Sequence, residues 1–297
     1  MRITEGLFAL SCSGLFACSA KTPPPLSAKD TAVAALSAIY VDKNLAAIDT
    51  YFARDVIRHD PTASGDGTAA LRADLSGIVH DTSWSSFRAF AQDDLVLVHD
   101  EYVLPTSAAH VSFDLFRLAA GKIAEHWTCG QLDPGTYASG HTMVDGSTTI
   151  DASADTAASE DVVSTPDVGF VPVVIIGGQF SRLADFLQPN FVQHDPLIAD
   201  GLMGLGAGFA QPPLNTLRVL SLPETLAESN FVFTRSLSTM TWDAQKANSP
   251  NNPTVTCDLF RVDGGKIAEH WDVIQLDPNS TDIANLRANA AGHTMWN

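Results

Sequence analysis

Hydrophobic residues follow a helical spacing at the start of the predicted folded part of the chain. The stretch 28–41, AKDTAVAALSAIYV, has this spacing with Asp30 as its N-cap, and the stretch 44–52, NLAAIDTYF, predicts a second, short helix that begins at Asn44. After a Gly-Asp-Gly turn, a third helix is predicted over 68–78. The first half of the chain is therefore predicted to open with helices.

The pattern then changes to runs that are rich in strand-forming residues. Four such runs, separated by turn-forming residues, lie at 85–92, 94–104, 109–119 and 122–132. Helices that are followed by an antiparallel meander of strands predict an α+β fold.

The same pattern is written a second time, with three matched blocks in the same order. The blocks are His-Asp-Pro at 59–61 and 194–196, a long segment with the shared heptapeptide GKIAEHW at 114–134 and 258–278, and Gly-His-Thr-Met at 140–143 and 292–295. The offset between the copies grows along the chain, as loop insertions in the second copy would produce. The repeat predicts two tandem domains, residues 29–144 and 168–297.

Between the copies, residues 145–167 are mostly Ser, Thr, Ala and Asp, and we interpret them as a linker. The second copy opens less regularly, because Pro172 and a glycine pair interrupt the helical pattern, so its first helix is expected to be shortened or lost. The glycine-rich stretch 201–209 lacks the strand–turn–helix context of a nucleotide site, and we interpret it as a flexible helix or lid beside a pocket.

The first eighteen residues resemble a bacterial lipoprotein signal. One Arg precedes an apolar stretch, and Leu-Phe-Ala stands directly before Cys18, whose thiol would take a lipid after cleavage. Residues 19–28 would then be a tether, and the protein is expected in the bacterial cell envelope, lipid-anchored or secreted, outside the cytoplasm. Because Glu5 interrupts the apolar stretch, a plain signal peptide or a mis-set start codon also fits.

The composition narrows the class of partner. The chain has 297 residues with 17 Lys and Arg against 34 Asp and Glu, a net charge of −17, which excludes nucleic acid and anionic membrane surfaces as expected partners. Beyond the leader no apolar run is long enough to span a bilayer, so membrane contact is expected only through the anchor. Cys129 and Cys257 are expected to be buried hydrophobic residues, and the histidines lack the close spacing of metal ligands.

Taken together, His-Asp-Pro after two helices and then Asp-Leu-Phe-Arg, Gly-Lys-Ile, Glu-His-Trp-Asp and Gln resemble the SnoaL-like branch of the nuclear-transport-factor-two-like superfamily. The resemblance covers nearly all of both predicted domains and is most specific at 258–275. It implies a conical fold with a curved sheet around an apolar pocket, and two fused copies would form an intramolecular pseudo-dimer, sheet to sheet. The name-giving members are polyketide cyclases, which close a ring by an aldol reaction without metal or cofactor.

Alternation along the strand KIAEHWDVIQ places His270 and Asp272 on one face and Glu269 and Trp271 on the other. A carboxylate beside an imidazole at an apolar cavity is suited to enolisation next to a carbonyl, with the carboxylate as base and the imidazole as proton donor. Alternatively, His270 hydrogen-bonds within the sheet and Asp272 pairs with Arg261.

The first copy keeps His126 but has Thr128 where the second has Asp272, so the second pocket is the better catalytic candidate. His194 is a third catalytic candidate, and His59, His126 and Thr128 are candidate pocket residues. His59 and His194 fit equally a role in fixing the turn at each Asp-Pro.

Large aromatic residues on the other face of this strand, Trp127 and Trp271, are expected to pack a sheet-to-sheet interface. Three functional classes remain open from the sequence. They are a cofactor-free cyclase, isomerase or lyase for a carbonyl compound, a non-catalytic envelope lipoprotein that binds a small apolar ligand, and a structural or partner-binding module.

Overall fold

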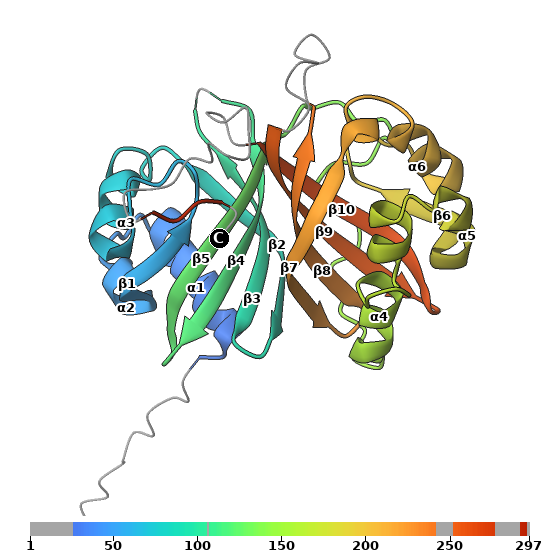
Figure 1. Cartoon of the computed structure of the whole chain (residues 1–297). Coiled ribbons are helices and arrows are strands. Elements are labelled where there is room, and N and C mark those ends of the chain that lie inside the picture. The colour runs from blue at the N-terminus through green and yellow to red at the C-terminus, as the bar shows by residue number, and fades with distance from the viewer. Residues whose placement is uncertain (1–25, 106, 242–251, 277–291, 296–297) are drawn as a thin grey trace, which may run out of the picture.

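The computed structural model describes residues 26–105, 107–241, 252–276 and 292–295. The predicted signal peptide with Cys18, and most of the predicted tether, lie outside the described residues. In the part that is described, no helix is long and apolar enough to cross a membrane. Two units stand side by side in Figure 1, each with a five-stranded sheet and its own helices.

The first unit opens with helices and ends with the predicted meander. Its elements are α1 (Ala28–Tyr40), α2 (Ala47–Tyr51), β1 (Phe52–His59), α3 (Gly67–Ser76), β2 (Ser83–Gln92), β3 (Leu95–Val103), β4 (His110–Ala119) and β5 (Lys122–Leu132). The strand order is β1-β5-β4-β3-β2, with β1 parallel to β5 and the other neighbours antiparallel. The N-cap of α1 is Ser27 rather than Asp30, and its side chain accepts a hydrogen bond from the Asp30 amide.

The second unit repeats this topology with strand order β6-β10-β9-β8-β7. Its elements are α4 (Thr156–Val163), η1 (Val171–Ile176), η2 (Phe180–Arg182), α5 (Leu183–Phe186), β6 (Leu187–Gln193), α6 (Gly201–Phe209), η3 (Leu214–Thr216), β7 (Arg218–Glu228), β8 (Phe231–Met240), β9 (Asn252–Asp263) and β10 (Lys266–Leu276). Strand β6 is parallel to β10, as β1 is to β5. The α+β fold expected from the sequence is therefore present in both halves.

Helix α4 arises within the segment that was interpreted as a linker. It contacts β7 and β8 as α1 contacts β2 and β3, and its Val163 is fully buried. Asp155 caps it by accepting hydrogen bonds from the amides of Ala157 and Ala158. The region around Pro172 forms only the short π-helix η1, so residues 156–163 supply the helix that the opening of the second copy cannot form.

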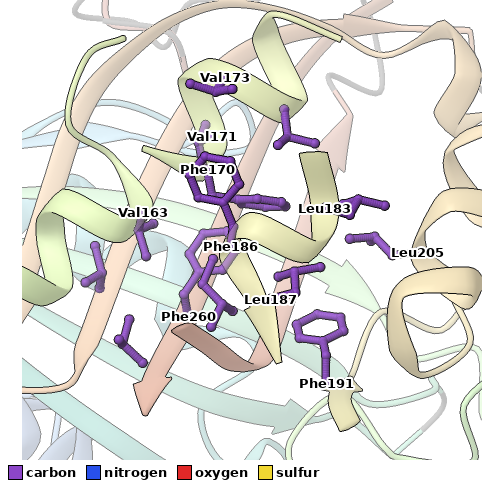
Figure 2. Packing of buried hydrophobic residues seen from close by; sticks show 14 of the residues in the cluster. Val163, Phe170, Val171, Val173, Leu183, Phe186, Leu187, Phe191, Leu205 and Phe260 are labelled. Carbon is purple, nitrogen blue, oxygen red and sulfur yellow. The ribbon is translucent and has the colours of Figure 1, made fainter. Parts of the chain in front are cut away.

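The core of the second unit lies between its helices and one face of its sheet. Figure 2 shows the cluster, in which the Phe170 ring centroid lies 6.0 Å from that of Phe186 and 5.8 Å from that of Phe260. Each fully buried ring of this size contributes about 1.5–3 kcal/mol. Phe170, Phe191 and Phe260 also line a cavity, so this core is the wall of the candidate site.

The opposite faces of the two sheets pack against each other in a separate core. The Phe90 and Phe231 rings stack across it with centroids 4.6 Å apart, and Trp127 and Trp271 both belong to it, as predicted. Two equivalent glutamines also accept hydrogen bonds from backbone amides of the opposite unit. Gln131 accepts from the Ile274 amide at 2.8 Å, and Gln275 accepts from the Gly130 amide at 3.1 Å.

Each Gly-His-Thr-Met segment reaches across to the other unit. His141, from the end of the first copy, lies 3.3 Å from Asp200 and its ring is 5.4 Å from that of His194. His293, from the end of the second copy, lies 2.6 Å from Asp66 in the first unit, and Figure 1 shows this red segment beside α3. The Gly-His-Thr-Met segment of each copy therefore contacts the other unit.

Candidate functional site

A cavity lies inside the second unit, between its helices and the inner face of its sheet. Its wall is mostly aliphatic and aromatic, and its polar members are Asp195, Ser236, Thr256, Asp258, His270 and Asp272. The free space inside it is about 40 Å³. A single water needs about 10–15 Å³ of such space, so a ligand larger than a few waters must displace side chains of the wall.

His270, on β10, faces acceptors with both ring nitrogens. Its Nδ1 lies 3.0 Å from Gln193 Oε1 and its Nε2 lies 3.2 Å from Asp258 Oδ1. Gln193 Oε1 also accepts from the amides of His194 and Asp195, which identifies this atom as the oxygen of the side-chain amide. The ring donates from Nδ1 to Gln193, and one proton lies between Nε2 and the Asp258 carboxyl, so His270 and Asp258 form a hydrogen-bonded imidazole–carboxyl pair.

Asp272 and Asp258 are directly opposite each other on the antiparallel strands β10 and β9. Two like charges in this position destabilise a sheet, so one of the carboxyls is better accommodated in its neutral form. Burial, together with the nearby charges of Asp195 and Asp258, raises the pKa of Asp272 well above its usual value. Burial thus favours the neutral form of Asp272.

Asp195, just after β6, is the third carboxyl of the group. Its Oδ1 accepts from the Leu197 amide at 2.6 Å, and its buried Oδ2 meets no fixed N–H or O–H donor in the described part of the chain. The neighbouring Asp272 carboxyl is the group that can supply that donor when it is protonated. Burial raises the pKa of Asp195, while the Leu197 amide and Asp272 oppose the rise. Two carboxyl groups in such contact share one proton more easily than they bear two charges.

The structure brings His270 and Asp272 together at the cavity and adds two carboxyls that the sequence reasoning missed. Arg261 does not pair with Asp272, because its Nε donates to Glu269 at 2.8 Å on the other face. The raised pKa of Asp272 suits this residue to the donor role, whereas the sequence suggested a base. Asp258 could have been found from the sequence, since the hairpin register places its motif opposite Asp272. In the described part of the chain, no group of three His, Cys, Asp or Glu is arranged to hold a metal.

His194 and His59 lie on the opposite face of the sheets, at the interface between the units. His194 stacks on Trp271 with centroids 4.7 Å apart and its Nε2 lies 3.1 Å from Glu269, while His59 stacks on Trp127 at 4.9 Å. Neither is among the residues that line the cavities of the described part of the chain. Both therefore pack on the tryptophan-bearing face of their sheet and do not face the cavity or the first pocket.

The first unit has a more polar pocket at the equivalent place, and the predicted pocket residues His126 and Thr128 line it. His126 Nε2 lies 2.7 Å from Asp114 Oδ1, and the Tyr102 hydroxyl donates to Asp114 Oδ2 at 2.6 Å. Thr128 stands opposite Asp114, in the register position that Asp272 holds in the second unit. At this register position the first pocket has a hydroxyl opposite its aspartate, where the second has a carboxyl opposite Asp258.

The first unit also has a fully buried carboxyl with a raised pKa. Asp100 accepts a hydrogen bond from Trp84 Nε1 at 2.7 Å, and burial together with the charge of Asp114 raises its pKa well above the usual value. Asp100 does not line the first pocket, whereas Asp272, the corresponding buried acid of the second unit, lines the cavity.

One part of the chain matches a known family model. Residues 33–126 match the SnoaL-like domain, and no curated protein matches the chain. An NTF2-like protein of unknown function from Cytophaga hutchinsonii is 11% identical, with 37% of this chain and 95% of that chain covered and a TM-score of 0.34. A steroid delta-isomerase from Pseudomonas aeruginosa is 13% identical, with 36% and 82% covered and a TM-score of 0.31. An LEH-like epoxide hydrolase from M. tuberculosis is 15% identical, with 35% and 82% covered and a TM-score of 0.31. Over residues 33–126, this chain is therefore similar to the SnoaL-like domain.

Proposed function

We propose that the second unit carries out cofactor-free acid–base chemistry on a small carbonyl compound, of the aldol, cyclase or isomerase type. The observation that supports this most strongly is the meeting of Asp272, a buried carboxyl whose pKa is raised, with the hydrogen-bonded pair His270 and Asp258 at one apolar cavity. Enolisation needs a base for the carbon-bound proton and a donor for the carbonyl oxygen. The cavity offers both within one group of side chains.

The roles follow from protonation and exposure. Asp258 is the only one of the three cavity aspartates that is partly exposed, so the proposal assigns to it the role of the base that takes the proton from the carbon next to the carbonyl. Asp272 donates its proton to the carbonyl oxygen as the enol forms. Asp195 holds Asp272 in place, and His270 holds Asp258 through the hydrogen bond between them.

Two outcomes are chemically open to the enol. If the enol is conjugated with a carbon–carbon double bond, return of the proton from Asp258 to the far carbon of that bond gives an isomer. Attack of the enol carbon on a second carbonyl of the same molecule instead closes a ring, and the new hydroxyl takes the proton held by Asp258. In both cases the carbonyl re-forms as the enol oxygen returns its proton to Asp272. Both routes leave the side chains in their starting state and need no co-reactant.

A non-catalytic binder of a small apolar ligand is the second candidate. The aromatic wall of Phe170, Phe191, Phe209 and Phe260 supports it, because such a wall gives affinity without chemistry. With Cys18 as a lipid anchor, such a protein would capture its ligand in the cell envelope. In this case substitution of Asp272 would change affinity, and no product would form.

The test is hydrogen–deuterium exchange at the carbon next to the carbonyl, followed by NMR in D₂O for a panel of small neutral ketones and diketones. The wild type is expected to exceed the buffer rate, and Asp258→Asn and Asp272→Asn are each expected to lower the enzymatic rate by about 10²-fold or more. Asp114→Asn, the equivalent change in the first unit, is the matched control and should retain exchange. Wild-type exchange no faster than buffer across the panel would favour the binder.

A further inference from the structure

A second hollow adjoins the cavity and opens to solvent. We call it the vestibule; its own residues include Gly177, Gly178, Phe180 and Arg218. Gly177, Gly178 and Arg218 are exposed. The three aspartates line only the cavity, on the far side of a wall that the two spaces share. The vestibule is therefore the side from which a ligand would enter.

The wall between the two spaces consists of apolar side chains that line both. They come from η1, the end of α6, η3 and the start of β7: Ile175, Phe209, Leu214, Leu217 and Val219. The Phe209 ring lies 5.2 Å from the Phe180 ring on the vestibule side. A molecule that spans both spaces must be apolar where it passes this wall.

The charges at the two ends of this path are opposite. None of Asp195, Asp258, His270 and Asp272 lines the vestibule, and among the described residues that line either space Arg218 is the only Lys or Arg. At the inner end three aspartates line the cavity with one histidine, so this end does not favour an anion. The outer end, with Arg218, attracts one.

Arg218 lacks an acidic partner among the described residues. Its Nη1 donates to the carbonyl oxygens of Asn215 at 3.2 Å and Leu217 at 2.6 Å, which fixes the guanidinium at the start of β7. No ion pair of Arg218 is found in the described ranges, although the chain has 34 acidic residues for 17 basic ones. A positioned guanidinium with free N–H groups is well suited to bind a carboxylate.

We propose that the cavity takes an apolar carbonyl compound that ends in a carboxylate, and that Arg218 binds this carboxylate in the vestibule. The inference rests on the proposed function for the carbonyl end, and it names the class of substrate. It also fixes the direction of binding, since the carbonyl group must point inward to Asp272 and Asp258 while the carboxylate remains outside the apolar wall. Arg218 is then a residue that determines specificity.

Matched probes that differ only in charge test this. Straight-chain oxo acids of increasing length, with the ketone at the far end, and their methyl esters are titrated into the full chain at low salt by calorimetry. For at least one length the wild type should bind the acid about tenfold more tightly than the ester, as expected for a charge-assisted hydrogen bond at a partly exposed site. Arg218→Gln should bind the two equally, with its affinity for the ester unchanged.

Arg54→Gln, which removes an exposed arginine from β1 of the first unit, is the control and should keep the preference. Equal binding of acid and ester by the wild type, an undiminished preference in Arg218→Gln, or no binding of any probe would each overturn the inference. The proposed function is tested separately, because exchange is followed with neutral ketones. Asp272→Asn should lose exchange and still prefer the acid over the ester.

Discussion

Replacing Asp272 by asparagine should change how the stability of the protein depends on pH. The folded state raises the pKa of Asp272 well above its usual value, through burial and the charges of Asp195 and Asp258. In the unfolded chain the carboxyl loses its proton near pH ~3.9. Between that pH and the folded pKa, the folded state binds one proton more than the unfolded state. The unfolding free energy of the wild type therefore falls by about 1.4 kcal/mol for each unit by which the pH rises.

Asparagine does not bind this proton, so Asp272→Asn abolishes this contribution to the pH dependence of stability. The amide of asparagine can donate to Asp195 as the protonated acid does, so the folded structure is expected to persist. The unfolding free energy of the variant minus that of the wild type should therefore rise by about 1.4 kcal/mol per pH unit from about pH 4 upward. Below this range the two proteins should differ little.

Urea unfolding of both proteins at a series of pH values measures the difference directly. Asp55→Asn, an exposed change of the same kind on β1, controls for the loss of an aspartate at a position that faces solvent. A difference between Asp272→Asn and wild type that is flat across this pH range would refute the reasoning. It would mean that Asp272 ionises in the folded protein as it does in the unfolded chain.

Three further predictions concern the interface between the units. Trp271→Ala should lower the unfolding free energy by about 3–5 kcal/mol, measured by urea unfolding, because the ring is fully buried and its Nε1 donates to the Asp145 carbonyl at 2.8 Å. For Glu269, burial alone would raise the pKa, but hydrogen bonds with His194 and Arg261 lower it to about 2. Its stabilisation is thus complete above pH ~4.3 and is lost as pH falls toward 2, so Glu269→Gln should cost about 3 kcal/mol at neutral pH and much less in acid. Cys129 and Cys257 are buried free thiols, so peptide mapping after treatment with a thiol reagent should find them unmodified until the protein is unfolded.

The sequence predicted the elements of the first unit well, because its amphipathic helices and strand runs form where their patterns place them. It did not reveal β1, since Phe52–His59 follows α2 without a break and pairs in parallel with the distant β5. Nor did it reveal α4, because eight residues of low hydrophobicity are helical only when Val163 packs into the core of the second unit. Both features depend on contacts that are remote in sequence.

At the site, alternation along one strand was sufficient to place His270 and Asp272 together. It could not show the proton balance, which depends on Asp258 across the hairpin and Asp195 after β6. His194 was misplaced relative to the cavity for a similar reason, because the face on which a residue after a strand lies is set by tertiary packing. The pattern within one strand is local information, whereas this cluster of three aspartates comes from three different parts of the fold.

The duplication has left the two units with different chemistry at equivalent points. Thr128 opposite Asp114 gives the first pocket a hydrogen-bonding hydroxyl, and Asp272 opposite Asp258 gives the second an acid. The shared interface, with the contacts of the two Gly-His-Thr-Met segments and the reciprocal glutamine bonds, holds both units in one arrangement. The two copies therefore share one fold and one interface while their pockets differ in polar groups.

The proton on Asp272 is the feature on which the proposed mechanism depends, and site-resolved titration measures it most directly. Carbon-13 NMR of aspartate-labelled protein should show one carboxyl, absent from Asp272→Asn, that titrates well above the usual aspartate midpoint of about 3.5. If the signal that disappears in Asp272→Asn instead titrates near that usual value in the wild type, Asp272 is an ordinary carboxylate and the account is contradicted.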